Sequence, residues 1–176
     1  MTATAQAVLN IARGELGYRE GPNNQNKYGA WYGMNYAPYC DIFLSWCAAQ
    51  AGAGSIIPRS SYVPSRLAKA KTAGLVSQAP RVGSLACFDF NGDGVPDHIG
   101  IVEAVLGDGR IQTIEGNTAS PLGGGSQADG GGVWRRNRST RLVVGHTYNV
   151  EINGRPAVVR IRAVRSKYAI ADEVRP

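Results

Sequence analysis

The stretch Cys40-Asp41-Ile42-Phe43-Leu44-Ser45-Trp46-Cys47-Ala48-Ala49-Gln50-Ala51 carries the clearest helix signal in this chain of 176 residues. Its apolar side chains recur at the three- and four-residue spacing of one helix face: Cys40, Phe43, Leu44, Cys47, Ala48 and Ala51. Pro38 stands just before this stretch and Gly52 just after it, which suits a helix start and a helix end. The sequence therefore predicts a helix that begins at Cys40 and packs into a core.

Helical patterns dominate the first half of the chain and strand patterns the second. One further helix is expected around residues 8–16, capped by Thr2 or Thr4, another runs from Pro64 to Ala73, and residues 21–39 are expected to form a loop. Strand-like runs separated by turn residues cover 85–88, 98–106, 110–114, 142–150 and 157–164. Asn153-Gly154 is a strong hairpin signal. Helices followed by strands indicate an α+β fold with an antiparallel sheet.

Charge is distributed unevenly along the chain. Residues 1–132 hold 9 Lys and Arg against 10 Asp and Glu, whereas residues 133–176 hold 10 against 3, a net charge of +7. We expect this basic segment either to attract anionic polymers or to coat a solvated β surface. Most of its charge comes from Arg135, Arg136, Arg138, Arg141, Arg155, Arg160, Arg162 and Arg165.

No segment suggests insertion in a membrane or export. Hydrophobic residues make up 43% of the chain, enough for a continuous core. No apolar run approaches the ~20 residues that a membrane-spanning helix needs. The first residues lack a basic region followed by an apolar block, so no secretory signal is expected.

The three cysteines do not form a disulfide or zinc pattern, because their number is odd and no Cys-x-x-Cys occurs. Cys40 and Cys47 on one helix would be ~10.5 Å apart along its axis, beyond the ~7 Å that a disulfide spans. Cys40 begins the helix, where the helix dipole and unpaired N–H groups favour a thiolate. It is therefore a candidate nucleophile, the alternative being a packed core cysteine. Cys47 and Cys87 fit apolar patterns and are expected in the core.

Of the two histidines, His98 is the better candidate for a general base. It begins a strand next to a loop, where functional residues concentrate, and Gly100 on the same face leaves room beside its ring. His146 lies within the basic segment. A third residue should accept the other imidazole N–H, and Glu115 or Asn117 at the end of the next strand is placed to do so.

These motifs, in this order, resemble the CHAP domain, the cysteine, histidine-dependent amidohydrolases/peptidases with a papain-like arrangement. The resemblance covers roughly residues 5–147 and rests on the segments Cys40, Gly83–Asp89, Asp97–Glu103 and Thr113–Asn117. It implies N-terminal helices packed on an antiparallel sheet, with Cys40 as nucleophile, His98 as general base, and Glu115 and Asn117 as its polar partners. The segment Asn26–Asn35 is most similar to actinobacterial and actinophage members.

The resemblance also implies residues that would contact the substrate. Some members have Gln directly before the cysteine, whereas this chain has Tyr39. Asn35 is therefore a candidate second donor of an oxyanion hole, beside the backbone N–H of Cys40. Trp31 and Tyr39 either line the substrate groove or pack in the core. The charge of Asp41 would oppose a thiolate at Cys40.

An acidic loop precedes His98 and resembles part of a calcium-binding loop. It places oxygen ligands at positions 1, 3, 5, 7 and 9, with Gly at position 6, but position 12 is Gly100 rather than Glu. We expect either a partial Ca²⁺ site or a solvated acidic turn, while the chemistry itself needs no cofactor. The expected ligands are Asp89, Asn91, Asp93, the Val95 carbonyl and Asp97.

The function implied is hydrolysis of an amide bond in the peptide part of peptidoglycan, by an N-acetylmuramoyl-L-alanine amidase or an endopeptidase. A phage endolysin is expected, held in the host cytoplasm until released to the wall, for example through a holin, or carried in a virion. The alternative is a non-catalytic wall-binding or virion structural module. We expect a monomer with a catalytic domain over 1–147 and a basic β-hairpin extension or linker over 148–176. Nucleic acid is not an expected partner, because basic and aromatic residues do not interleave.

Overall fold

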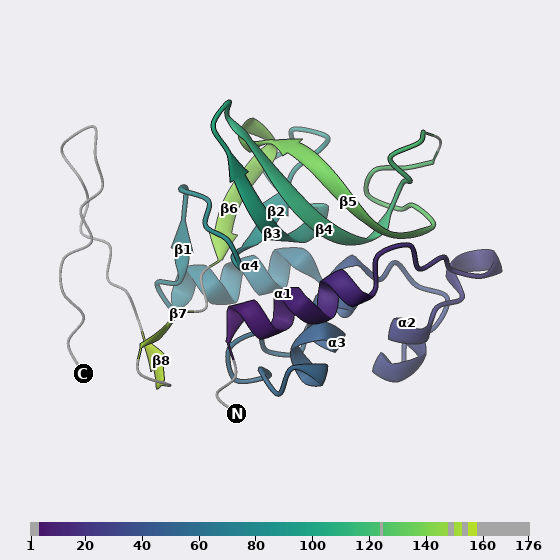
Figure 1. The fold of residues 1–176 in the computed structure, drawn as a ribbon, viewed down its shortest axis with the longest axis horizontal. Helices are drawn as coiled ribbons and strands as arrows, with labels where there is room; N and C mark the ends of the chain where they lie inside the picture. Colours follow the sequence, from purple (N-terminus) through teal and green to yellow (C-terminus); the bar gives the residue numbers. More distant parts are fainter. Residues whose placement is uncertain (1–3, 124, 148–149, 153–154, 158–176) are drawn as a thin grey trace.

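Helices lie along one face of a six-stranded antiparallel sheet (Figure 1) in the computed structural model, which describes residues 4–123, 125–147, 150–152 and 155–157. The helices are α1 (Ala5–Gly14), η1 (Pro22–Asn24), α2 (Lys27–Tyr32), α3 (Cys40–Gln50), α4 (Val63–Thr72) and η2 (Thr140–Leu142). The sheet has the order β1-β6-β2-β3-β4-β5. Its strands are β1 (Val76–Ser77), β2 (Leu85–Phe88), β3 (His98–Leu106), β4 (Arg110–Thr118), β5 (Gly132–Ser139) and β6 (Val143–Thr147). The predicted α+β class is confirmed.

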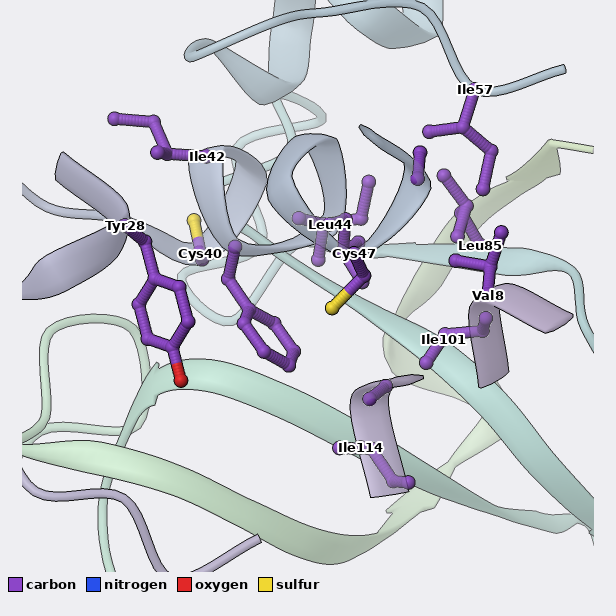
Figure 2. Close-up of a cluster of buried hydrophobic side chains, with 14 of the residues drawn as sticks. Val8, Tyr28, Cys40, Ile42, Leu44, Cys47, Ile57, Leu85, Ile101 and Ile114 are labelled. Carbon is purple, nitrogen blue, oxygen red and sulfur yellow. The ribbon is translucent and has the colours of Figure 1, made fainter. Parts of the chain in front are cut away.

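Helix α3 is the centre of the core and begins at Cys40, as predicted. It contacts α1 and α2 as well as β3 and β4, so it is buried on almost all sides rather than on one face. Gly116 of β4 permits this close approach, because a Cβ there would lie 2.7 Å from Cβ of Phe43. Figure 2 shows Cys40, Leu44 and Cys47 following one another along the helix, with Tyr28 beside its first turn.

The N-terminal third contains one α-helix and one short 3-10 helix more than the sequence predicts. Thr4 caps α1, with its Oγ1 accepting from the Ala7 N–H at 3.0 Å. Within the expected loop at 21–39, however, Asn26 caps the short helix α2 by accepting from the Gly29 N–H at 2.6 Å. Gly33 ends α2 in the left-handed region at φ +86°. Residues 33–39 are irregular, so the predicted loop is confirmed there and is wrong over Pro22–Asn24 and Lys27–Tyr32.

Predicted strands 85–88 and 98–106 coincide with β2 and β3. Strand β4 runs four residues further than predicted, and β5 is an additional strand that pairs with it. Beyond the sheet, β7 (Val150–Ile152) and β8 (Arg155–Ala157) pair antiparallel on either side of the predicted hairpin turn. Most of the predicted strand 157–164 lies outside the described residues, and the domain boundary at 147 stays a prediction. No helix in the described part of the chain is both long and apolar enough to span a membrane.

Candidate active site

Cys40 is the first residue of α3, and its side chain retains a small exposed area of 8%. The capping residue, Tyr39, makes no side-chain hydrogen bond to the first turn, which leaves the helix N–H groups to polarise whatever lies there. Cys47 and Cys87 are fully buried, and all three cysteines are free. Burial raises the pKa of Cys87 to about 12 and holds that of Cys47 well above its ordinary value. All three cysteines are buried, and Cys40 is the one that retains any exposed surface.

His98 is fully buried at the start of β3 and stacks against Phe88 and Phe90, with ring centroids 6.3 Å and 5.7 Å away. Its two ring nitrogens have different surroundings. Nε2 lies 3.1 Å from Oε2 of Glu115, whereas Nδ1 has no hydrogen-bond partner among the described residues. Burial lowers the pKa of His98, but its interactions with the Cys40 thiol and with Glu115 outweigh burial and raise the pKa to about 9. The imidazolium is therefore the resting form at neutral pH.

Glu115 is fully buried on β4, next to His98, and remains ionised. Burial would raise its pKa, but hydrogen bonds from Arg138 and His98 lower the pKa to about 2. Thr113 also donates to Oε1 at 2.6 Å. Room for this side chain comes from Gly100, because a Cβ at that position would lie 2.6 Å from Cγ of Glu115. The space that Gly100 was predicted to leave beside His98 is filled by the carboxylate.

Arg138 of β5 binds both oxygens of Glu115 and is itself buried, with 6% exposed. Its Nε donates to Oε1 at 2.9 Å and its Nη2 to Oε2 at 2.6 Å. The guanidinium also lies over the Phe90 ring, 4.8 Å from the centroid. Its Nη1 donates to Oε1 of Gln127 at 2.7 Å. The sequence placed Arg138 in a basic segment expected either to attract anionic polymers or to coat a solvated β surface, whereas the structure buries it against Glu115.

Asn117 lies two residues beyond Glu115 but faces a different partner. It adopts a left-handed conformation at φ +56°, at a register irregularity between β4 and β5. Its Nδ2 donates to the Ala128 carbonyl and to Asp129, both at 3.2 Å. The sequence left Glu115 and Asn117 as alternatives for the residue that contacts His98. Glu115 makes this contact, whereas Asn117 binds the loop that connects β4 to β5.

Residues 12–117 match the CHAP domain family, which amounts to more than half of the chain. The chain belongs to the CHAP domain family. No curated protein matches it. Two solved structures are similar to this chain. The structure of Ly7917 has 20% identity and a TM-score of 0.47, with 81% of this chain and 61% of that chain covered. The structure of Ly7917 with the hydrolyzing product of MDP has 20% identity and a TM-score of 0.49, with 83% of this chain and 63% of that chain covered. The chain spans about three fifths of the length of these structures.

The charge of Asp41, next to Cys40 in this CHAP domain, is compensated. Asp41 is buried and pairs with the Arg66 guanidinium of α4, and Ser60 donates to its other oxygen at 2.5 Å. Arg66 also donates to Ser45 at 3.0 Å. Because Arg66 balances its charge at contact distance, the opposition to a Cys40 thiolate expected from Asp41 is largely cancelled. The network also ties α4 to the first turn of α3.

The three residues predicted to contact the substrate have different surroundings in the CHAP domain. Tyr39 is fully buried and stacks on Tyr28 at 5.5 Å, so the groove role is wrong for this side chain and its packing alternative holds. Trp31 is 37% exposed and lies under the guanidinium of Arg59, 5.0 Å from the ring centroid. Asn35 accepts from the Asn26 and Tyr36 N–H groups, both at 3.0 Å, which leaves its Nδ2 as the group available to donate.

The oxygen-rich loop before His98 is held by its own backbone. Asp89 accepts from the N–H groups of Gly92 and Gly94, both at 2.7 Å, and Asp93 accepts from Val95 at 2.8 Å. Asn91 accepts from the Asp93 N–H at 3.0 Å.

Asp97 accepts from the Phe90 N–H at 3.0 Å through one oxygen, while its other oxygen is buried without a partner among the described residues. Within that part of the chain, no group of three or more His, Cys, Asp or Glu side chains is placed to hold a metal ion. The loop is an acidic turn closed by its own N–H groups, and each Asp89 oxygen keeps one lone pair beyond the bond that it accepts. The Ca²⁺ site stays a prediction.

His146 lies on β6, which β2 separates from β3. It is fully buried, and neither ring nitrogen has a hydrogen-bond partner among the described residues. Burial lowers its pKa to about 4, so the ring is neutral at physiological pH. Among the described residues, no carboxylate binds the His146 ring, in contrast to His98.

Sequence reasoning missed Arg138 and Thr113, which both bond to Glu115. A signal was present: in the segment Gly132–Ser139, alternation places Arg136 and Arg138 on the face opposite Arg135. The structure follows this alternation, since Arg135 pairs with Glu103 at the surface, through Nη2 at 3.0 Å. Arg160, Arg162 and Arg165 lie outside the described residues, and Arg155 is placed only as the first residue of β8.

Proposed function

We propose that this CHAP domain is a cysteine-dependent hydrolase that cleaves an amide bond in the peptide part of peptidoglycan. One observation carries the proposal. His98 has its Nε2 fixed by an ionised carboxylate, its Nδ1 without a hydrogen-bond partner among the described residues, and its pKa raised to about 9 partly by the thiol of Cys40. A thiol paired with a resting imidazolium is the arrangement that activates a cysteine nucleophile.

In the proposed reaction, the Cys40 thiolate attacks the amide carbonyl carbon and forms a tetrahedral oxyanion. Backbone N–H groups at the start of α3 stabilise that charge, with the Asn35 Nδ2 as the proposed second donor. The C–N bond then breaks, and the His98 imidazolium gives its proton to the leaving amine, which leaves a thioester on Cys40. Neutral His98 next removes a proton from water, which attacks the thioester. The acid is released, and the thiolate and imidazolium are restored.

Glu115 supports this cycle without exchanging protons. Its pKa of about 2 keeps it ionised across the working range, and its contact with Nε2 leaves the other ring nitrogen, Nδ1, without a hydrogen-bond partner among the described residues, as the proposed proton exchange with Cys40 requires. His146 is not suited to the base role, because burial lowers its pKa to about 4 and it has no orienting partner among the described residues.

Support for peptidoglycan as the substrate comes from membership of the CHAP family. Amidase and endopeptidase activities use the same chemistry, since both hydrolyse amides. Mass spectrometry of digested wall fragments would identify the bond cleaved. The roles as a phage endolysin and as a monomer stay predictions.

The deciding experiment measures lysis of purified cell walls by Cys40→Ala and Cys40→Ser variants. We expect a loss of at least about 10³-fold for both, because the nucleophile is removed. Cys47→Ala is the matched control, since it truncates a buried thiol of the same helix. Iodoacetamide should modify Cys40 alone in the native protein. Full lysis by Cys40→Ala would refute the proposal and favour a non-catalytic wall-binding module.

A further inference from the structure

Arg138 contacts Glu115, one of the proposed site residues, but contacts neither Cys40 nor His98 through a hydrogen bond among the described residues. It comes from β5, the strand that pairs with β4 on the side away from β3. The guanidinium lies on Glu115, and Glu115 in turn contacts His98. Two parallel N–H···O bonds fix both the position and the plane of a carboxylate, which a single donor cannot do.

The carboxylate has four side-chain contacts, and Arg138 supplies two of them. The others come from Thr113 and His98. An isolated carboxylate taken out of water costs several kcal/mol, and it takes up a proton unless charge and hydrogen bonds compensate. Glu115 is fully buried, so its charge depends on these partners. Among the effects that lower its pKa, the hydrogen bond from Arg138 is the largest.

We propose that Arg138 is a positioning residue that keeps Glu115 ionised and aimed at His98 Nε2, and so holds His98 protonated beside the nucleophile. This inference rests on the proposed cysteine hydrolase function, in which His98 is the acid and the base. Arg138 does not touch the reacting atoms itself. It acts on His98 only through the carboxylate that both contact.

Arg138 also joins the site to the segment between β4 and β5. Gln127, in this segment, accepts through one oxygen from Arg138 at 2.7 Å and from Arg136 at 2.8 Å. Thr118 receives a further bond from Arg138 at 3.1 Å and donates to the Gln127 carbonyl at 3.1 Å. The guanidinium therefore donates from Nε and Nη2 to Glu115, from Nη2 to Thr118 and from Nη1 to Gln127. Lysine, with one ammonium, cannot reproduce this fork.

Two effects on His98 compete when Arg138 is removed. If Glu115 stayed ionised and in place, loss of a nearby positive charge would raise the pKa of His98. If Glu115 took up a proton or turned away, His98 would lose its support, and burial would lower the pKa. The second effect should win, because Arg138 contacts Glu115 directly and is not among the leading influences on the pKa of His98.

The test is an NMR titration of the two imidazole rings in the full chain. Wild type should show His98 titrating near 9 and His146 near 4. For Arg138→Met we expect the His98 transition to fall by at least about one pH unit, and the alkaline limb of the pH–lysis profile to fall with it. Arg138→Lys keeps a positive charge but loses the pair of parallel N–H donors, so its His98 transition should lie between those of wild type and Arg138→Met. The His146 signal, still near its wild-type position, reports that the core of each variant is intact.

The matched control is Arg135→Met, three residues earlier on β5, where the arginine pairs with Glu103 at the surface. It should leave both titrations unchanged. A double-mutant cycle adds a second readout if Arg138→Met folds poorly. Because Arg138 acts through Glu115, the effect of Arg138→Lys on the His98 transition should be largely lost in a Glu115→Gln background.

An unchanged or raised His98 transition in folded Arg138→Met or Arg138→Lys would overturn the inference, and so would fully additive effects in the cycle. The titration does not depend on hydrolysis, so it separates the two claims. Lysis by Cys40→Ala would refute the proposed function whatever the titration shows. A normal titration in the Arg138 variants, with Cys40→Ala inactive, would refute only the role of Arg138.

Discussion

Replacing Gly100 by alanine should impair the site without changing any group that takes part in the chemistry. A Cβ at position 100 would lie 2.6 Å from Cγ of Glu115, 3.2 Å from the Ile114 carbonyl oxygen and 3.3 Å from Cβ of Thr113. Carbon atoms in contact prefer about 3.5–4.0 Å, so Glu115 must move by about 1 Å. The backbone contact at Ile114 cannot yield as a side chain can.

The expected magnitude follows from that displacement. Glu115 Oε2 is 3.1 Å from His98 Nε2, and a shift of about 1 Å would take this contact beyond hydrogen-bond range. Misplacement on this scale costs about 10²-fold in rate. Overpacking should also lower the free energy of unfolding by about 1–3 kcal/mol.

Wall lysis and thermal unfolding should be measured for Gly100→Ala beside Gly107→Ala. Gly107 directly follows the last residue of the same strand, and a Cβ there would meet no atom within 4 Å. We expect the control to keep full lysis. Wild-type lysis by a folded Gly100→Ala protein would show that the spacing between Glu115 and His98 does not govern the rate, and our account of the site would be wrong.

The sequence and the structure together give four further predictions. Glu115→Gln should lower the pKa of His98 from about 9 to below its ordinary value, because burial persists without the carboxylate; at pH 7.5 the imidazolium fraction would drop from about 97% to under about 10%. An unshifted alkaline limb in the pH–lysis profile would contradict this. Burial lowers the pKa of His146 to about 4, below its ordinary value of about 6.5. The neutral ring therefore makes its full contribution to the free energy of unfolding above pH about 6.5. Up to about 3 kcal/mol of that free energy is lost as the pH falls through 4. Urea unfolding should therefore show that the free energy of unfolding falls less between pH 7 and pH 4.5 for His146→Leu than for wild type. Equal decreases in the two proteins would refute this prediction. If the loop at 89–97 binds Ca²⁺, the melting temperature should rise between EDTA and millimolar Ca²⁺, whereas an unchanged value would remove the site. Neutralising Arg155, Arg160, Arg162 and Arg165 together should weaken binding to anionic walls at low salt but not cleavage of a soluble muropeptide; a response flat in salt would defeat the electrostatic role.

Local sequence patterns predicted the elements that carry the chemistry. The apolar spacing from Cys40 onward placed the helix start at the residue where α3 begins, and the apolar run from His98 gave the bounds of β3. Both patterns arise because the side chains that pack against neighbouring elements are apolar, so their spacing in the sequence follows the period of the helix or strand. Helix α2 was missed because a six-residue helix is too short to show periodicity, and only its caps, Asn26 and Gly33, mark it.

The support of Glu115 was not predictable in the same way. Strand β5 has two arginines facing inward, so its sequence looks like a solvated surface until the buried carboxylate on the next strand is known. The role left open between Glu115 and Asn117 depends on a backbone conformation, φ +56° at Asn117, that no residue pattern announces. Asn117 alternates correctly with Glu115 in the sequence, yet the irregular register turns it toward Asp129.

The order of these parts along the chain has a consequence for synthesis. A chain made from its N-terminus exposes Cys40 early and completes its folding only when later segments arrive. Arg138 lies 98 residues after the thiol and beyond the family match at 12–117. A nascent or truncated chain that ends soon after residue 117 would hold the thiol, the imidazole and the carboxylate, yet leave that carboxylate without its guanidinium. Such a chain would also lack β6, which lies between β1 and β2 in the sheet, so a shortened fragment meant to test the proposed hydrolase activity should keep both β5 and β6.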